Sequence, residues 1–225
     1  MDTTQDIRNQ DINDLAKEIR QRVFALRNGE VAAQMRQGGV DYGKNYGLLL
    51  PQLRGIADDY PRSLALSEAL LAVDAREYRL LSLMLFPTDA SLEQLTARAA
   101  RLEYDEEAEV FALVTTPKME AAPLWATQQL NADASSSTLL AALMTLFRLA
   151  GRLSEDARRQ LLTPMATLSL TTASNARMAG KLLAELALLD APEEEQRYRD
   201  ALAAISADEA LRPVLDHHFR QEMGE

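Results

Sequence analysis

Apolar residues recur with the period of an α-helix along almost the whole chain. In the first segment they follow one another at intervals of three and four: Ile12, Leu15, Ile19, Val23 and Leu26. This spacing places them on one face of a helix. The alternating runs of valine, isoleucine and threonine that are typical of a half-buried strand are missing from the sequence. The sequence therefore predicts an all-α fold.

Glycine, proline and capping residues divide this pattern into about a dozen helices of roughly 9–18 residues. Asn28-Gly29 ends the first helix, and Pro51 suits the first turn of a later one. Another helix is expected to open at Leu102 and to end near Thr116-Pro117. Three helices are expected to follow capping residues: Ser63, Asp74 and Ser91.

Short helices of similar length with short connections are typical of an α-solenoid or of an irregular bundle. No strict repeat is visible, and the tetratricopeptide and ankyrin signatures are missing, so degenerate HEAT-like units are favoured. We expect residues 1–225 to form one HEAT-like domain, in which antiparallel helix pairs stack into an α-α superhelix. The concave face of such a stack is the usual place of its function.

Composition indicates the class of protein and the cellular compartment to be expected. Hydrophobic residues make up 47% and charged residues 26%, as in ordinary folded proteins, and there is no cysteine to form disulfides or thiolate sites. The first 15 residues are polar and acidic, unlike a secretory signal, and no apolar run is long enough to span a membrane. A cytoplasmic protein without a membrane segment is expected.

Charge is distributed unevenly along the chain, whose net charge is −10. Residues 20–57 carry six cations and two anions, a local charge of +4, whereas residues from 63 onward carry 15 cations and 25 anions. The basic segment is either a normally solvated face or a strip that binds phosphates. If it binds duplex DNA, the candidate contacts are Arg36, Lys44 and Arg54, joined by Arg148 if folding gathers it beside them.

Metal and cofactor sites find no support in the sequence. The only two histidines, His217 and His218, are adjacent, so on a helix they point about 100° apart and cannot chelate as an i,i+4 pair would. The glycines between residues 38 and 47 match neither the dinucleotide nor the Walker spacing. We expect neither a metal nor a cofactor.

Five carboxylates cluster between residues 103 and 109, where they suit the N-terminus of a helix. Within them, Asp105 directly follows Tyr104, and an aromatic ring beside a carboxylate could bind a cationic ligand. Simple capping is the alternative role for Asp105. The single tryptophan, Trp125, fits a core or interface position better than a stacking platform. Arg76 and Arg79 lie beside Glu77 and are expected to form structural ion pairs.

The stretch from Arg27 to Pro87 resembles the N-terminal half of the DNA alkylation repair family, the HEAT-like-repeat alkylpurine DNA glycosylases and their relatives. The resemblance rests on a Tyr46-Gly47-Leu48-x-x-Pro51 turn into a helix, followed by an acidic corner. An Arg-Glu-aromatic helix start then follows as Arg76-Glu77-Tyr78. Beyond residue 90 only the helix pattern is similar.

For this family, the resemblance implies a superhelix that holds duplex DNA in a basic groove. Its glycosylases remove cationic alkylpurines with an aspartate lined by tryptophans and an arginine, which would stabilise the developing positive charge. The family's Trp-Trp-Asp falls on Glu103-Tyr104-Asp105, so Asp105 is the candidate catalytic carboxylate and Tyr104 the candidate aromatic. The groove arginine is replaced by leucine before Ala141-Ala142, and Gly180–Glu185 lacks the family's tryptophan and arginine.

Two hypotheses follow from these observations. The first is a protein of the DNA alkylation repair type that binds DNA weakly, with doubtful glycosylase activity centred on Asp105. The second is a non-catalytic HEAT-like scaffold for a protein partner, which is favoured by the net charge of −10 and by the missing arginine and tryptophan.

Overall fold

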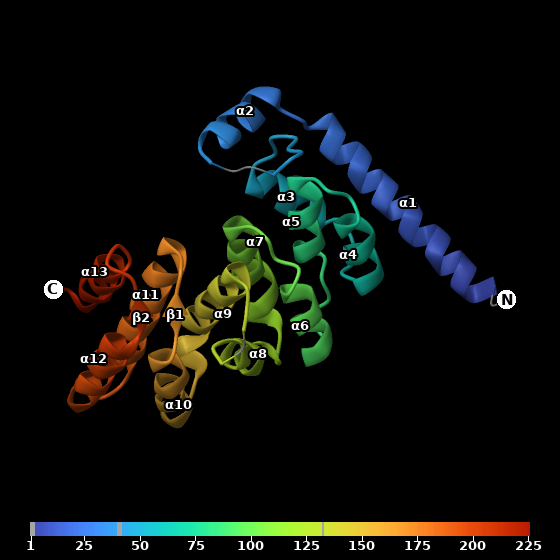
Figure 1. Cartoon of the computed structure of the whole chain (residues 1–225). Coiled ribbons are helices and arrows are strands. Elements are labelled where there is room, and N and C mark those ends of the chain that lie inside the picture. Colours follow the sequence, from blue (N-terminus) through green and yellow to red (C-terminus); the bar gives the residue numbers. More distant parts are fainter. Residues whose placement is uncertain (1–2, 40–41, 132) are drawn as a thin grey trace. The chain divides into compact units, whose positions relative to one another are not determined.

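The computed structural model describes residues 3–39, 42–131 and 133–225, and most of these residues are helical, with almost no strand. The fold class predicted from periodicity is therefore confirmed (Figure 1). The contacts divide the chain into two compact units, the first ending at Ala90 and the second beginning at Ser91. Among the described residues, no helix combines the length and the apolar character needed to cross a bilayer.

The first unit consists of a long helix followed by four short ones. Ile19 and Val23 of the long helix are fully buried, as the three-and-four spacing predicts, and this helix packs on the fourth. The third and fourth helices both contact the fifth, which is buried along its whole length. The helices are α1 (Thr3–Ala25), α2 (Gly29–Gln37), α3 (Leu50–Ala57), α4 (Leu64–Leu71) and α5 (Arg76–Met84).

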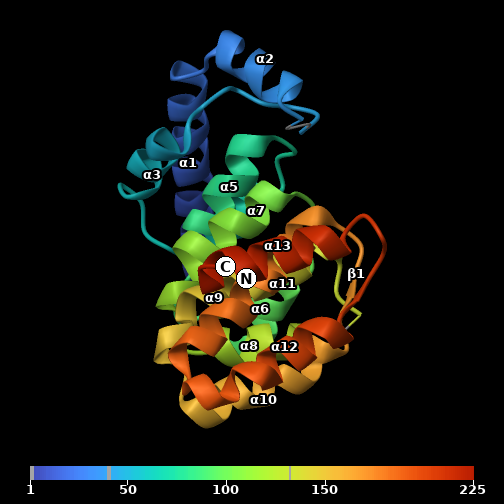
Figure 2. The same ribbon diagram turned by 90° about the vertical axis from the view of Figure 1, so that its left-hand side faces the viewer.

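The second unit has eight α-helices in two alternating series. In one series α7, α9, α11 and α13 pack each on the next, and beside it α6 contacts α8 and α10 contacts α12 (Figure 2). The helices are α6 (Leu92–Ala99), α7 (Asp105–Val110), α8 (Ala122–Gln129), α9 (Ser136–Leu149), α10 (Glu155–Ala166), α11 (Ala173–Leu189), α12 (Glu195–Ala204) and α13 (Arg212–Met223).

Side-chain caps begin α2, α4, α6, α9, α10 and α11. The Ser63 hydroxyl accepts the N–H of Leu66, and the Ser91 hydroxyl accepts that of Gln94, so both predicted caps are confirmed. The predicted cap at Asp74 is wrong. Ala75 occupies the cap position of α5, and its methyl side chain can accept no hydrogen bond.

The helix predicted to end near Thr116-Pro117 changes its pitch on the way. After α7 it continues as one π-helical turn, Phe111–Thr115, and then as a 3-10 turn, Thr116–Lys118. At the junction the buried hydroxyls of Thr116 and Thr145 form a 2.9 Å hydrogen bond, which ties this segment to α9.

Two very short strands interrupt the helical pattern and were not expected. β1 (Ser169–Leu170) pairs in parallel with β2 (Ser206–Ala207) and links the segments that follow α10 and α12. Strands of two residues are too short to produce an alternating sequence pattern, so periodicity could not reveal them.

Candidate functional site

A buried carboxylate fixes the loop between α2 and α3. The Glu77 side chain is fully buried and accepts the backbone N–H groups of Tyr46, Gly47 and Leu48 at 2.9, 3.1 and 3.2 Å. The guanidinium of Arg76 donates to the Leu48 carbonyl at 2.7 Å and to Glu77 at 3.1 Å. Arg76 thus has the expected structural role, with a loop carbonyl and the adjacent Glu77 among its partners, whereas the hold of Glu77 on the loop was not expected.

Gly47 makes this loop conformation sterically possible. Its φ of +78° lies in the left-handed region, and an added Cβ would stand 2.1 Å from the Asn28 carbonyl oxygen. Asn28 in turn donates its N–H to the Tyr46 carbonyl at 2.8 Å and caps α2 with its side chain. The loop therefore also fixes the start of α2.

Aromatic and cationic side chains meet on the same loop. The rings of Tyr46 and Tyr78 meet edge to face with centroids 5.6 Å apart, and Lys44 Nζ lies 5.2 Å from the centre of the Tyr46 ring. Burial, followed by a hydrogen bond with Tyr46, raises the pKa of Tyr78 above its ordinary value. The loop thus carries a positive charge against a partly exposed aromatic surface.

The three predicted DNA contacts of the first unit come from successive segments. Arg36 lies in the last turn of α2, Lys44 in the loop and Arg54 in α3, and all three residues are exposed. None of them forms an ion pair with another residue in the described part of the chain. Their positive charges are thus available to an external anion.

The candidate catalytic carboxylate lies in the second unit. Asp105 is the first residue of α7 and is exposed, and its Oδ2 accepts the hydroxyl of Ser174 at 2.5 Å. Tyr104 occupies the cap position of α7 and is half-buried. Ser174 belongs to the first turn of α11, so the hydrogen bond joins the starts of two helices. This contact gives Asp105 a structural role in addition to any chemical one.

Charged side chains of α7, α9 and α11 surround this contact. Burial raises the pKa of Glu109, an effect that the neighbouring Arg177 opposes and that Asp105 and Glu106 reinforce. Arg148, the predicted contact from α9, also acts electrostatically on Glu109. The structure thus brings Arg148 near the acidic cluster that contains Asp105.

Trp125 belongs to the hydrophobic core. The side chain is fully buried and packs edge to face on Phe111, with ring centroids 5.5 Å apart. The prediction of a core position is confirmed, so this ring does not line a ligand site.

Metal-binding chemistry finds no set of ligands in the described residues. No group of three or more histidine, aspartate or glutamate side chains is arranged to hold an ion. His217 and His218 lie side by side on α13 with ring centroids 5.1 Å apart.

Sequence analysis missed a second buried carboxylate. The Asp190 side chain at the end of α11 is fully buried and accepts Arg158 Nε at 2.6 Å and the Tyr198 hydroxyl. These donors come from α10 and α12, so Asp190 joins three helices. An aspartate directly after an apolar helix end was the available signal, but nothing in the sequence indicates its partners.

Fold and site together define a helical protein in which Glu77 and Asp190 organise buried hydrogen-bond networks. Its exposed cations Arg36, Lys44 and Arg54 form no ion pair with any other residue that the structure describes. No family model, curated protein or solved structure matches the chain.

Proposed function

We propose that the chain is a DNA-binding protein, a divergent relative of the DNA alkylation repair family, that holds the phosphate backbone without efficient base excision. The observation that carries the proposal is the exposure of Arg36, Lys44 and Arg54, which form no ion pair with any other residue that the structure describes. Phosphate contacts from such cations supply most non-specific DNA affinity. The Lys44 carbonyl accepts the Arg76 N–H at 2.9 Å, and Glu77 binds the N–H groups of residues 46 to 48. The backbone that carries Lys44 is thus tied to α5, so less of its freedom is lost on binding.

The helix contacts of the second unit support a HEAT-like superhelix. Helices α7, α9, α11 and α13 form one layer. The contacting pairs α6 with α8 and α10 with α12 lie beside it, as in two layers of stacked helix pairs. Such layers generate a concave face when each pair rotates slightly against the next. This arrangement supports the superhelical part of the proposal, whereas the proposed phosphate contacts Arg36, Lys44 and Arg54 belong to the first unit.

The residues at the family's groove positions argue against efficient excision. Lys181 stands where the resemblance places a tryptophan, and its Nζ forms a 2.8 Å ion pair with Glu222. Asp105 is bound to Ser174 and is surrounded by further acids, so its carboxylate has no aromatic enclosure comparable to that of the glycosylases. An exposed carboxylate stabilises a developing cation less than one in a site of low dielectric constant.

The test is a salt titration of binding to a fluorescent duplex, measured by anisotropy for the wild type and for a triple variant Arg36→Gln, Lys44→Gln and Arg54→Gln. Each lost phosphate contact lowers the magnitude of the logarithmic salt slope by about 0.9, so the triple variant should lose roughly two to three units. The matched control neutralises three exposed or half-buried arginines of the second unit: Arg152, Arg159 and Arg197. An equal loss in both variants, or no binding by the wild type at about 50 mM salt, contradicts the proposal.

Excision is tested separately on the same protein. The wild type and Asp105→Asn are incubated with a duplex that contains methylated purines, and the released bases are counted. We expect no difference between them, because Asp105 has a structural partner in Ser174. Release that depends on Asp105 would instead identify a glycosylase and leave the DNA-binding surface unchanged.

A protein partner is the second candidate, favoured by exposed apolar side chains in the first unit. Phe24, Leu26 and Leu49 are 53%, 45% and 51% exposed. A contiguous exposed apolar surface marks protein contacts, and these three side chains are the positions at which we propose one. If this candidate is right, the purified chain should not bind the fluorescent duplex. The same titration therefore distinguishes the two functions.

A further inference from the structure

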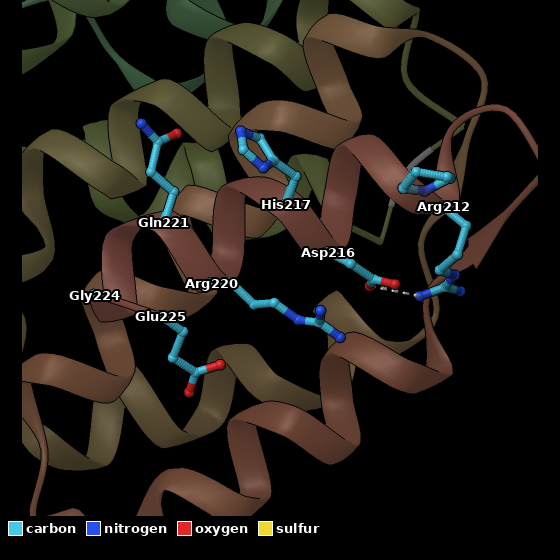
Figure 3. A pocket seen from close by; sticks show the side chains of 8 residues that line it. Arg212, Asp216, His217, Arg220, Gln221, Gly224 and Glu225 are labelled. Carbon is cyan, nitrogen blue, oxygen red and sulfur yellow. Dashed lines mark ion pairs between the residues drawn. The ribbon is translucent and has the colours of Figure 1, made fainter.

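The last two helices form a furrow lined by arginine side chains. A hollow of 560 Å³ along α13 and one of 370 Å³ between α12 and α13 share Arg212, Asp216 and Arg220 (Figure 3). Because the two hollows have these residues in common, they are parts of one furrow. Arg199 of α12 lines the second hollow. This furrow carries three guanidinium groups on a chain with a net charge of −10.

One of the three arginines is held in place by backbone groups. Arg212 donates to the Leu202 carbonyl at 3.0 Å and also to the Ile205 carbonyl, both near the end of α12. Its guanidinium lies 3.8 Å from the carboxylate of Asp216. Arg212 therefore joins α12 to α13 and forms a fixed wall of the furrow.

A second arginine already binds carboxylates of this chain. Arg199 Nε donates to Glu195 at 2.7 Å, and a terminal nitrogen of Arg199 binds the side chain of Glu225. The same guanidinium lies 5.3 Å from the centre of the Phe219 ring. An arginine over an aromatic ring, facing a carboxylate, is an arrangement that also recognises acidic side chains of other proteins.

The third arginine has no partner. The Arg220 side chain is exposed and forms no ion pair or hydrogen bond with any other residue that the structure describes. In Figure 3 its side chain extends from α13 on the same side as those of Arg212 and Asp216. It lines both hollows, so an anion that enters either of them meets this charge.

We infer that the furrow binds an acidic segment of a partner protein, with one carboxylate replacing Glu225 on Arg199 and another bound by Arg220. The contact between Glu225 and Arg199 is an internal copy of the proposed one. Glu195 and Glu225 pair with Arg199, and Asp216 pairs with Arg212, so these carboxylates balance two of the three arginines. The furrow therefore offers separate positions for single carboxylates rather than the row of uncompensated cations that a phosphate backbone needs. This surface is independent of the DNA-binding proposal.

The test measures the anisotropy of a fluorescent, end-capped hexaglutamate peptide with the full chain at low salt. Arg220→Gln should weaken binding about fivefold, the value of one exposed ion pair. Glu225→Gln should strengthen binding by about the same factor, because it removes the internal competitor. The matched control is Arg197→Gln, which removes an exposed charge of α12 that pairs with Glu194 and lies outside the furrow.

Three results would overturn the inference. Peptide affinity that falls equally in Arg220→Gln and Arg197→Gln would indicate a general charge effect. If Glu225→Gln leaves the affinity for the peptide unchanged, Glu225 does not compete with the peptide for Arg199. If Arg220→Gln weakens the binding of a short duplex DNA more than the binding of the peptide, the furrow binds nucleic acid instead. A helical circular dichroism spectrum equal to that of the wild type is required of each variant.

Discussion

Two buried carboxylates of the chain, Glu77 and Asp190, stabilise it in different ways. Glu77 of the first unit accepts three successive backbone N–H groups of one loop, whereas Asp190 of the second unit accepts side chains from two other helices. The first determines the path of a loop that no regular hydrogen-bonding pattern would hold. The second connects helices that are already formed. Loss of the first carboxylate should therefore be the more damaging, because backbone groups would be left buried without partners.

The largest effect is expected for Glu77→Gln. This change removes the charge opposite the buried Arg76 and presents an amide to backbone donors, so the free energy of unfolding should fall by about 3–5 kcal/mol. Urea denaturation followed by circular dichroism measures it. Glu120→Gln, an exposed position, is the control and should change stability by less than about 0.5 kcal/mol. A loss of similar size for both would contradict the assigned role of Glu77.

A smaller but still large loss is expected for Gly47→Ala. The added methyl group would collide with the Asn28 carbonyl at a φ of +78°, which should cost more than about 2 kcal/mol. Gly55→Ala provides a matched comparison within α3, where an added Cβ meets no atom within 4 Å. That variant should gain about 0.5–1 kcal/mol from higher helix propensity. Equal effects of the two alanines in urea denaturation would disprove the loop argument.

In the second unit, Tyr198→Phe isolates one donor to Asp190. The hydroxyl that is lost contributes a single hydrogen bond to a charged group, and Arg158 remains bound, so about 1.5–3 kcal/mol is expected. Chemical denaturation of the variant measures it. A loss larger than that of Glu77→Gln would reverse the ranking of the two networks.

The smallest effect is expected for the change of the free energy of unfolding at alkaline pH, which is measured by urea denaturation at a series of pH values. Burial, followed by the hydrogen bond to Asp190, raises the pKa of Tyr198, and burial likewise raises that of Tyr78. The stability that each buried phenol contributes is complete below about pH 10 and is lost as pH rises further, because the unfolded phenol ionises first. Tyr198→Phe should therefore reduce the fall of stability between about pH 10 and 11. A pH dependence identical to that of the wild type would show that Tyr198 does not titrate on unfolding.

Local features of the fold could be predicted where neighbouring residues determine them. Ser63 and Ser91 cap their helices because each bonds to a backbone N–H three residues away. The role of Glu77 could not be derived in the same way, since its acceptor contacts lie 29 to 31 residues away. Asp74 shows the opposite error: a suitable capping residue was present, yet the helix begins after Ala75.

The candidate sites were predicted only as residue types. Exposure of Arg36, Lys44 and Arg54 follows from their polarity, but the lack of carboxylate partners depends on the tertiary fold. Asp105 was selected through resemblance, and its bond to Ser174 spans 69 residues. The arginine furrow of α12 and α13 was missed because sequence patterns do not indicate which helix faces pair.

The π-helical turn at Phe111–Thr115 changes the direction in which the side chains after it point. A π turn accommodates one more residue than an α turn, so every side chain after it is rotated by about 100° relative to an uninterrupted helix. That rotation directs the Thr116 hydroxyl towards Thr145 of α9. Deletion of a single residue within the turn would restore the ordinary pitch and turn Thr116 away from its partner. In an alignment, a one-residue gap at this point would therefore represent a change of geometry rather than a change of loop length.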